Sequence, residues 1–512
     1  MRSHQLSPIF WSFQQNVERH PGKTALIIEE KQWSYQTLGA ELDALCAGLA
    51  QLPFRQGDHV GILLPNCFEF VLLLLAGARL GLVLVPQSMA LPPQAIETSF
   101  RDADVRHLVV WAGLNANLND ATIALAKDGA RIVMGEAPRD WLSFEDVQEK
   151  GRQAKFVDID VHPSQNYLLL MTSGSTGKPK PITLSQETKQ LRIQSAVELY
   201  GATDQDVTMA ATPLYHSLAQ RLVLLPLTTG GTSVLLTHFT PSLWMDAAAR
   251  HQVSFTIAVS SQLKQILGLL ETSATSLPAM RCIVSSSALL DEDTKRQLVA
   301  RLHCDFHECY GASEIAFGTN LSPAAGQHKL GSVGTAIPGA CIRVIDDKGS
   351  PVPTGTPGEI VCSTPMHFSG YYKQPELTAA AYIDDCFRTG DLGRLDDEGY
   401  LYFLGRIKDI VITGGINVYP QDIEDVVASL GFVRECAVIA VPDDRLGEVV
   451  GVVCALRDDA PADAQRDIQR ACMARLADFQ QPRRFFLIDE LPRNAMGKLD
   501  RPRLRETYAK QI

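Results

Sequence analysis

The residues best suited to chemistry lie in a loop of glycine, hydroxyl and lysine residues. A short apolar run, strand-like in length, leads into Thr172-Ser173-Gly174-Ser175-Thr176-Gly177-Lys178, and Lys180 follows after one proline. Glycines let the backbone approach an anion, successive N–H groups and hydroxyls donate hydrogen bonds, and lysines supply charge. It is not a Walker A loop, because only Ser175 and Thr176 separate Gly174 from Gly177. On composition alone, a phosphate-binding loop and a flexible surface loop explain the stretch equally well.

Three later segments carry further carboxylates and cations. The turn Tyr310-Gly311-Ala312-Ser313-Glu314 ends in a carboxylate, and one carboxylate suffices for a Mg²⁺ that keeps several waters. Asp391 follows a glycine, and a carboxylate in such a turn accepts hydrogen bonds from both hydroxyls of a ribose, with Arg406 as a neighbouring cation. Lys498 ends an exposed-looking loop and suits a developing negative charge. As isolated peptides, such segments are more often solvated surface.

Together, these segments resemble the motifs of the adenylate-forming superfamily, which includes acyl-CoA synthetases, carrier-protein acyl ligases, peptide-synthetase adenylation domains and firefly-type luciferases. Five motifs occur in family order across residues 168–501, and the N-terminal third is compatible with the family. Two departures are visible: Pro181 stands where the family usually has glycine, and Ser313 stands where it has threonine.

The resemblance implies a role for each candidate residue. Residues 172–180 would hold the β- and γ-phosphates of ATP, with Tyr310 and Gly311 beside adenine and Asp391 and Arg406 at the ribose. Glu314 would bind Mg²⁺, while Ser313 and Lys498 would act near the α-phosphate. The remaining positions are His216 at the carboxylate pocket, Ser285, Ser286 and Ser287 along the acyl pocket, Gly414 and Gly415 at the thiol tunnel, and Lys408 as a hinge.

The reaction implied by the resemblance has two half-reactions. A carboxylate attacks the α-phosphorus of Mg-ATP and expels pyrophosphate, and a thiol then takes the acyl group from the adenylate and releases AMP. Because the first step joins two anions, we expect positioning and charge stabilisation to dominate over acid–base catalysis. His216 stands where amino-acid-activating relatives carry aspartate, so an α-amino acid is not the expected substrate.

Two other functions remain as alternatives. The expected thiol is free CoA, and the runner-up is the phosphopantetheine of an acyl carrier protein, because basic residues follow Pro482. A regulatory, non-catalytic nucleotide-binding relative is the more remote alternative, and the presence of Lys498, Glu314 and Asp391 argues against it.

The length and periodicity predict an α/β protein of at least two domains. A chain of 512 residues exceeds one ordinary core. Strand-like runs at 24–28 and 58–64 alternate with a helical run at 35–52, which predicts layered α/β subdomains with parallel sheet. With the resemblance, this predicts an AMP-binding core over residues 1–407 and a small mobile α+β domain over 408–512 that carries the catalytic lysine.

The composition excludes several classes of protein. A net charge of −11 argues against a nucleic-acid binder. No secretory segment opens the chain, and residues 70–85 read as a buried helix running into a strand rather than a membrane span. Eleven cysteines without a Cys-x-x-Cys pair fit reduced thiols, so we expect a cytoplasmic protein. The cluster His303, Cys304, His307 and Cys309 alternates along a strand, which disfavours a zinc site.

Overall fold

The computed structural model describes residues 6–114, 118–172, 180–272, 276–325, 327–493 and 499–508. The chain divides into two compact units. The larger unit comprises residues 1–341 and 362–387, and the smaller comprises residues 342–361 and 388–512. The boundary expected at 407/408 concerns mobility and stays a prediction.

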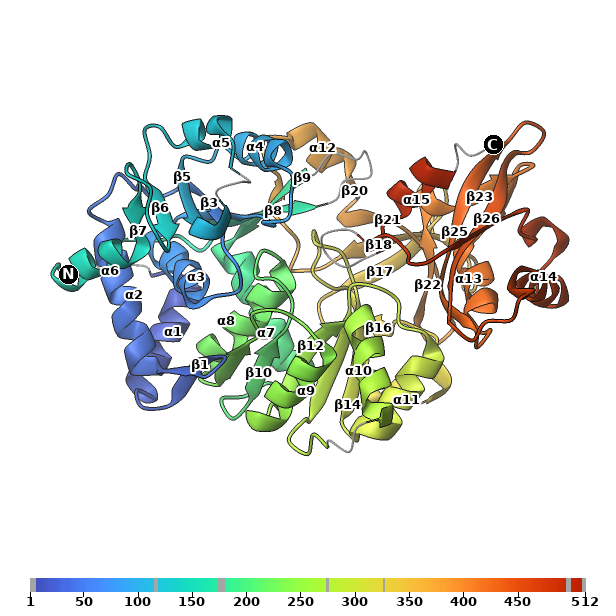
Figure 1. The fold of residues 1–512 in the computed structure, drawn as a ribbon, viewed down its shortest axis with the longest axis horizontal. Coiled ribbons are helices and arrows are strands. Elements are labelled where there is room, and N and C mark those ends of the chain that lie inside the picture. Colours follow the sequence, from blue (N-terminus) through green and yellow to red (C-terminus); the bar gives the residue numbers. More distant parts are fainter. Residues whose placement is uncertain are drawn as a thin grey trace. The chain divides into compact units, whose positions relative to one another are not determined.

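The larger unit is built on two mainly parallel sheets (Figure 1). The first runs in the order β16-β15-β14-β13-β12-β10-β11-β1-β2 and the second in the order β19-β9-β8-β4-β3-β5-β6-β7. The strands of the first sheet are β1 (Thr24–Ile28), β2 (Lys31–Ser34), β10 (Val207–Ala210), β11 (Thr232–Leu235), β12 (Phe255–Val259), β13 (Cys282–Ser286), β14 (Asp305–Tyr310), β15 (Thr319–Leu321) and β16 (Thr335–Ala336). Those of the second are β3 (His59–Leu63), β4 (Val83–Pro86), β5 (His107–Trp111), β6 (Arg131–Met134), β7 (Leu142–Ser143), β8 (Asn166–Thr172), β9 (Lys180–Ser185) and β19 (Gly370–Tyr371).

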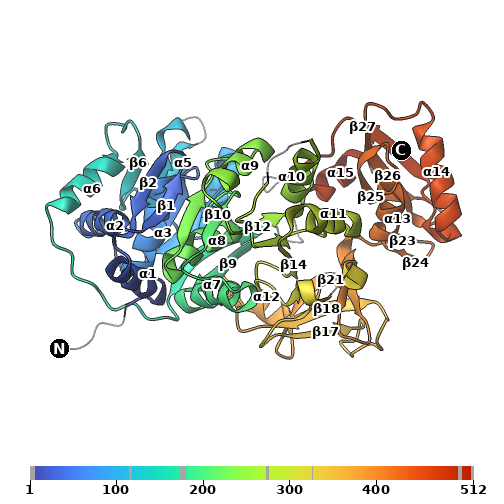
Figure 2. The same ribbon diagram turned by 90° about the horizontal axis from the view of Figure 1, so that it is seen from below.

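Helices cover and separate these two sheets. Two of them, α7 (Gln186–Tyr200) and α8 (Ser217–Thr229), lie side by side between the sheets, because α7 contacts β9 while α8 contacts β10 and β11 (Figure 2). The other helices of this unit are α1 (Pro8–Arg19), α2 (Tyr35–Leu49), α3 (Phe68–Leu80), α4 (Pro93–Asp102), α5 (Asp120–Leu125), α6 (Phe144–Arg152), α9 (Pro241–Arg250), α10 (Ser260–Thr272), α11 (Glu292–Leu302) and α12 (Pro375–Ala380).

Local sequence explains the element boundaries. Ser34 caps α2 by accepting a hydrogen bond from the backbone N–H of Thr37, and the leucines spaced three or four residues apart in this helix are buried. Gly81 ends α3 at φ 61°, a left-handed conformation that favours glycine. The segment at 70–85 is the predicted buried helix and strand, α3 and β4. Among the described residues, no helix is both long and apolar enough to cross a membrane.

The smaller unit has two sheets. Its first contains β17 (Cys341–Ile345), β18 (Gly358–Ser363), β21 (Cys386–Leu395) and β22 (Leu401–Arg406). The short strand β20 (Tyr382–Ile383) belongs to the larger unit, as do the first two residues of β21, with which it pairs. The second has the order β24-β23-β26-β25 with β27 on β26, and its strands are β23 (Val411–Thr413), β24 (Ile416–Val418), β25 (Val433–Asp443), β26 (Gly447–Leu456) and β27 (Arg484–Ile488). The helices α13 (Pro420–Ala428), α14 (Ala464–Arg475) and α15 (Arg501–Tyr508) accompany it. The predicted fold class, α/β with a smaller α+β unit, is confirmed.

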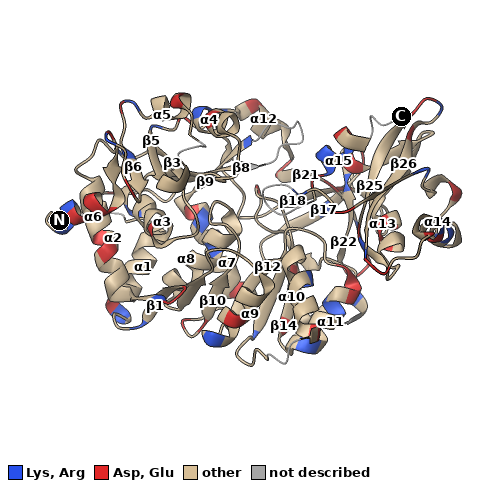
Figure 3. Ribbon diagram, in the orientation of Figure 1, with Lys and Arg blue, Asp and Glu red and all other residues tan. Residues whose placement is uncertain are grey.

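Charged residues of both signs alternate on the surface helices. Lys and Arg are interspersed with Asp and Glu on α11 and α14 (Figure 3). Within α11, Arg296 pairs with Glu292 at 2.6 Å, and within α14, Arg470 pairs with Asp467 at 3.3 Å. Pairs of this kind are solvated and contribute about 0.3–0.5 kcal/mol each.

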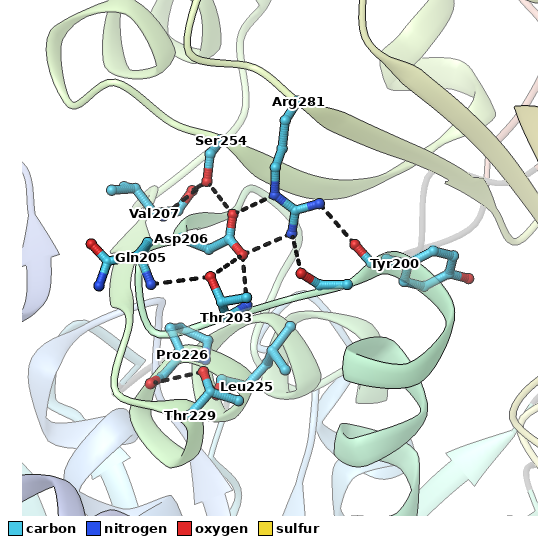
Figure 4. A network of polar contacts seen from close by, with 11 residues as sticks. Tyr200, Thr203, Gln205, Asp206, Val207, Leu225, Pro226, Thr229, Ser254 and Arg281 are labelled. Atoms are coloured by element: carbon cyan, nitrogen blue, oxygen red, sulfur yellow. Dashed lines mark hydrogen bonds and ion pairs between the residues drawn. The ribbon is translucent and has the colours of Figure 1, made fainter.

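A network of polar contacts around the buried Asp206 carboxylate joins the amino ends of three neighbouring parallel strands (Figure 4). Asp206 precedes β10, Ser254 precedes β12 and Arg281 precedes β13. The Asp206 carboxylate accepts hydrogen bonds from Arg281 at 2.7 Å through both oxygens and from the Ser254 hydroxyl at 2.6 Å. Burial alone would raise the pKa of Asp206, but the bonds from Arg281 and Ser254 lower it. The network is structural, since it lies at the edge opposite the carboxyl ends of the strands.

We expect Arg281→Met to destabilise the protein by about 3 kcal/mol, because it leaves the buried Asp206 carboxylate without its cation. Urea unfolding measures the effect as a lower midpoint. Since the folded pKa of Asp206 is depressed, its contribution is present above the unfolded pKa of about 3.9 and is lost as the pH falls through the folded value. The matched control is Arg250→Met, whose exposed pair with Glu30 should matter by less than about 1 kcal/mol. Equal urea midpoints for Arg281→Met and Arg250→Met would contradict the stabilising role of the pair between Arg281 and Asp206.

Candidate active site

Three groups of candidate residues of the larger unit lie at the carboxyl edge of the first sheet. β10, β13 and β14 are parallel members of this sheet, and the segments that leave their carboxyl ends carry His216, the serines from 285 to 287, and the residues from Tyr310 to Glu314. In open parallel sheets this edge is where ligands bind, because loops of different strands meet there. The sheet topology therefore brings together three segments that the sequence could only name separately.

His216 occupies the amino terminus of α8. It is the N-cap residue, with φ −101° and ψ 144°, and its imidazole lies against the Tyr215 ring with centroids 4.2 Å apart. The loop before it is fixed by buried Asn66, whose side chain donates to the carbonyl of Thr212 at 3.0 Å and accepts from the N–H of Leu214 at 2.7 Å. The half-buried histidine is thus held on a rigid turn, as a residue that orients a substrate must be.

The three serines do not share one face. Ser285 is fully buried and pairs across strands with Glu308, which points toward α11 because it is ion-paired with Lys295 of that helix. Ser286 lies on the opposite face, next to the Cys309 thiol, and Ser287 is exposed in a turn at φ 76°. Ser286 and Ser287 thus suit an acyl pocket at this edge, while Ser285 faces the core of the layer that holds α11.

The turn after β14 is tightly closed. A Cβ atom on Gly311 would lie 2.1 Å from the carbonyl oxygen of Ala316, so only glycine fits. Ala316 itself adopts φ 61°, and the N–H of Gly318 donates to the carbonyl of Tyr310 at 2.9 Å. This compact turn leaves Ser313 exposed and Glu314 half-buried, which suits side chains that must meet a nucleotide.

Glu314 is held by its backbone and by its side chain. Its carbonyl oxygen accepts hydrogen bonds from the N–H of Phe368 at 2.6 Å and from the guanidinium of Arg192 at 3.2 Å. Its carboxylate oxygen Oε1 accepts from the Tyr371 hydroxyl at 3.0 Å. Burial, and then the Glu314 carboxylate, raise the pKa of Tyr371, so the phenol keeps its proton and remains a donor. Sequence reasoning missed Tyr371, for which the only local signal is the preceding Gly370 at φ 125°.

The strands beside the phosphate loop form a hairpin. β8 and β9 pair antiparallel, and the pair Thr172 and Lys180 closes the ladder at the loop. Residues 173–179, which include Ser173, Gly174, Ser175, Thr176, Gly177 and Lys178, lie outside the described residues, as does the side chain of Thr172. Lys180 places its ammonium 5.3 Å from the centre of the Tyr371 ring, and Tyr371 pairs with Ile182 of β9. Tyr371 therefore links the edge of the phosphate loop to Glu314.

In the smaller unit, Asp391 and Arg406 face one another across a β ladder. They are directly paired residues of β21 and β22, with Arg406 Nε 3.5 Å from Asp391 Oδ1. Gly390 precedes the aspartate at φ 67°, and the N–H of Asp391 donates to the hydroxyl of Thr389 at 3.1 Å. The structure brings the two residues together, and their role at a ribose stays a prediction.

The predicted hinge and thiol-tunnel residues lie in short connections. Lys408 is exposed in a single 3-10 turn that follows β22, and the next residue, Asp409, is anchored by Arg505 of α15 at 3.0 Å. Gly414 and Gly415 form the two-residue turn between β23 and β24, with φ values of 56° and 83°. Both glycines have positive φ, as this kind of tight hairpin requires. Ile416, next to the turn, is 47% exposed and gives it an apolar wall.

The loop expected to carry the catalytic lysine is fixed at both ends. Residues 494–498, and with them Lys498, lie outside the described residues. On either side, Arg493 and Leu499 form an antiparallel bridge, and Arg493 also pairs with Glu435. Two residues beyond the bridge, Arg501 donates to buried Glu424 at 2.9 Å. The described residues on both sides of 494–498 are therefore held in place by the rest of the smaller unit.

The described side chains do not assemble a metal site of their own. Among them, no group of three or more His, Cys, Asp or Glu residues could hold a metal ion. His307 is instead buried next to Asn320, with its Nδ1 3.2 Å from the Asn320 amide nitrogen. For Mg²⁺ bound with a nucleotide, the half-buried Glu314 carboxylate, oriented by Tyr371, is a fitting hard oxygen ligand.

Two family matches cover most of the chain. The AMP-binding enzyme family matches residues 13–372, and the AMP-binding enzyme C-terminal domain matches residues 422–498. Among curated proteins, the chain is 30% identical over 501 residues to an indoleacetate–CoA ligase of Aromatoleum aromaticum, covering 97% of this chain and 98% of the relative. It is 29% identical over 495 residues to a 2-succinylbenzoate–CoA ligase of Bacillus pumilus, covering 95% of each.

Solved structures are similar over almost the whole chain. ATP-bound MatB from Rhodopseudomonas palustris has a TM-score of 0.89 and 30% identity, covering 99% of both chains. The o-succinylbenzoate CoA synthetase of Bacillus subtilis, in complex with its acyl-adenylate intermediate, has a TM-score of 0.86 and 27% identity, covering 98% of both.

Proposed function

This chain belongs to the AMP-binding enzyme family and is an AMP-forming acid–thiol ligase. We propose that the candidate residues of the preceding subsection carry out the two half-reactions, and that the substrates are a carboxylic acid, ATP and CoA. The observation that supports the proposal most strongly is the linked arrangement of Lys180, Tyr371 and Glu314, which joins the phosphate-loop hairpin to the carboxylate suited to Mg²⁺. The indoleacetate and 2-succinylbenzoate ligases are both named for CoA as the acceptor, which favours free CoA over a carrier protein.

The first half-reaction requires two anions to meet. In the proposed mechanism, the loop at 172–180 donates backbone, hydroxyl and lysine hydrogen bonds to the β- and γ-phosphates, and Tyr310 lies beside adenine. Asp391 accepts from the ribose hydroxyls while Arg406 keeps the carboxylate oriented. His216, fixed on its turn, orients the acid. A Mg²⁺ held at Glu314 would neutralise part of the triphosphate charge.

The second half-reaction needs a path for the thiol of CoA. We assign the Gly414-Gly415 turn to this path, because its two glycines leave backbone without side chains beside the exposed Ile416. We assign Lys498 to stabilisation of the negative charge at the α-phosphate in the first step. We assign the chain near Lys408 to the backbone rotation that changes the arrangement between the two steps. A cytoplasmic location is supported by eleven free thiols, which suit a reducing compartment.

The function is tested by pyrophosphate release from Mg-ATP over a panel of aliphatic, aryl and dicarboxylic acids, each with and without CoA, with product masses recorded. We expect at least one acid to give sustained release only when CoA is present, together with acyl-CoA and AMP. Chelation of Mg²⁺ should abolish release. ATP binding without pyrophosphate release from any acid would instead support a regulatory nucleotide-binding protein.

A further inference from the structure

Three basic side chains are buried in the helix layer between the two sheets of the larger unit. Lys189 and Arg192 belong to α7 and Arg221 belongs to α8, two helices that contact one another and are drawn in green in Figure 2. Their exposed fractions are 0%, 1% and 6%. Burial of three neighbouring cations is costly unless negative charge is supplied.

The hydrogen-bond acceptors around these cations are neutral. Lys189 donates to the side-chain oxygen of Gln220 at 3.1 Å and to the carbonyl of Ser217 at 3.4 Å. Arg192 donates to the carbonyls of Met366 and Glu314. The arginine of α8 lies over the Phe317 ring at 4.7 Å.

No carboxylate in the part of the chain that the structure describes forms an ion pair with any of the three. Every aspartate and glutamate of the sequence lies in that part. Two other buried cations of this unit, Arg79 and Lys295, are paired with carboxylates. Arg79 contacts Asp158 at 2.7 Å as well as Asp43, and Lys295 pairs with Glu308. We call the group of Lys189, Arg192 and Arg221 the buried cation cluster. It differs from the paired cations because none of its members has a carboxylate partner among the described residues.

The pKa shifts of the three side chains agree with their lack of a carboxylate partner. Burial, and then the two guanidinium groups, hold the pKa of Lys189 well below its usual range. Burial and Arg221 also lower the pKa of Arg192 to about 9, and Glu314 opposes this shift. Burial lowers the pKa of Arg221 as well. A bound anion would oppose each of these pKa shifts, because a neighbouring negative charge favours the protonated cation.

The cluster adjoins the candidate acid site. Ser217 directly follows His216, and Arg221 is four residues further along α8, so the two side chains share one face of the helix about 6 Å apart. On this face, the hydroxyl of Ser217 and the Nε–H of Arg221 are both buried without a hydrogen-bond partner among the described residues. Phe317, under Arg221, belongs to the turn that carries Glu314.

We propose that Arg221, together with Lys189 and Ser217, binds a second carboxylate that the acid substrate carries in addition to the one that is activated. This inference rests on the proposed function and names its substrate class, a dicarboxylic acid. The planar guanidinium of arginine accepts a carboxylate with two parallel hydrogen bonds, and the hydroxyl of Ser217 adds a third donor. His216 lies at the near end of the same helix, so one carboxyl can be activated while the other is held deeper between the sheets.

The test compares each diacid from succinic to suberic acid with its own monomethyl ester, using initial rates of pyrophosphate release. For the wild-type protein, we expect kcat/KM for the best diacid to exceed that of its monoester about 10- to 100-fold, as for one charged hydrogen-bonding group. Arg221→Met should remove this preference, mainly through KM, and Arg221→Lys should keep part of it. Lys189→Met should reduce the preference as well.

The matched control is Arg79→Met, which removes a buried arginine that is paired. This variant should lower the melting temperature by several degrees, because two carboxylates lose their cation. It should not change the ratio of kcat/KM for the diacid to kcat/KM for its monoester. An unchanged ratio in Arg221→Met, or equal efficiency of diacid and monoester in the wild type, overturns the inference.

A binding measurement separates the inference from the proposed function. In the presence of a non-hydrolysable ATP analogue, the best diacid should raise the melting temperature of the wild-type protein more than its monoester does. If this difference is present but no acid releases pyrophosphate, the proposed function fails and the anion subsite stands. If pyrophosphate is released but diacids and monoesters stabilise equally, the function stands and the subsite is wrong.

Discussion

Replacing Lys498 with alanine is expected to slow formation of the acyl-adenylate a hundredfold to a thousandfold, or about 3–4 kcal/mol in the activation free energy. The reason is charge. As pyrophosphate leaves, negative charge grows on the α-phosphate, and a compact ammonium delivered by a loop stabilises it only in the transition state. The flanks of this loop are pinned by the bridge of Arg493 with Leu499 and by the pair of Arg501 with Glu424, so the loss should not arise from misfolding.

The two half-reactions are measured separately for this variant. Pyrophosphate exchange reports the adenylation step, and conversion of a supplied acyl-adenylate with CoA reports the thiol step. We expect the first to collapse and the second to remain within a few-fold of wild type. Arg503→Ala, which removes an exposed cation from α15 just beyond the loop, is the control and should change neither step. Unimpaired adenylation in Lys498→Ala would remove this lysine from the mechanism.

Replacing Lys408 with proline is expected to suppress the thiol step far more than the adenylation step. Proline fixes φ near −65° and restricts the preceding residue, so it limits rotation of the chain between β22 and the segment anchored at Asp409. The resting 3-10 turn accommodates proline in its first turn, and the folded protein should therefore still form the adenylate. Because adenylation and thiol transfer need different groups at one site, we expect the chain to change its arrangement between the two steps.

The control for this variant is Lys408→Ala, which removes the charge but leaves both backbone dihedrals free. We expect the alanine variant to retain the thiol step, so that the proline effect is assigned to the backbone. Single-turnover formation of acyl-adenylate, followed by addition of CoA, gives both rates in one experiment. Equal loss of both steps in Lys408→Pro, or the same loss of the thiol step in Lys408→Ala, would argue against a hinge at this position.

Several elements of the fold were predicted correctly from local sequence. The strand at residues 24–28 and the helix from Tyr35 appear where alternation and the spacing of leucines placed them, because burial of one face dictates these periods. The apolar run at 70–85 forms the buried helix α3 and the strand β4 of the second sheet, rather than a membrane span. The boundary expected at 407/408 stays a prediction, and residues 342–361 join the smaller compact unit through contacts distant in sequence, which local patterns do not show.

The sequence by itself determined the chemistry of this protein, because glycine, hydroxyl, carboxylate and lysine residues in ordered motifs state which groups a nucleotide would meet. Only the tertiary structure decided which partners these groups have. Tyr371 reaches Glu314 because β19 pairs with β9, and Ser285 lies beside Glu308 because β13 pairs with β14. The buried cation cluster is likewise invisible in the sequence, where Lys189 and Arg221 look like ordinary surface residues of two helices. Burial and charge pairing depend on neighbours brought together across many residues of chain, and local patterns do not encode those neighbours.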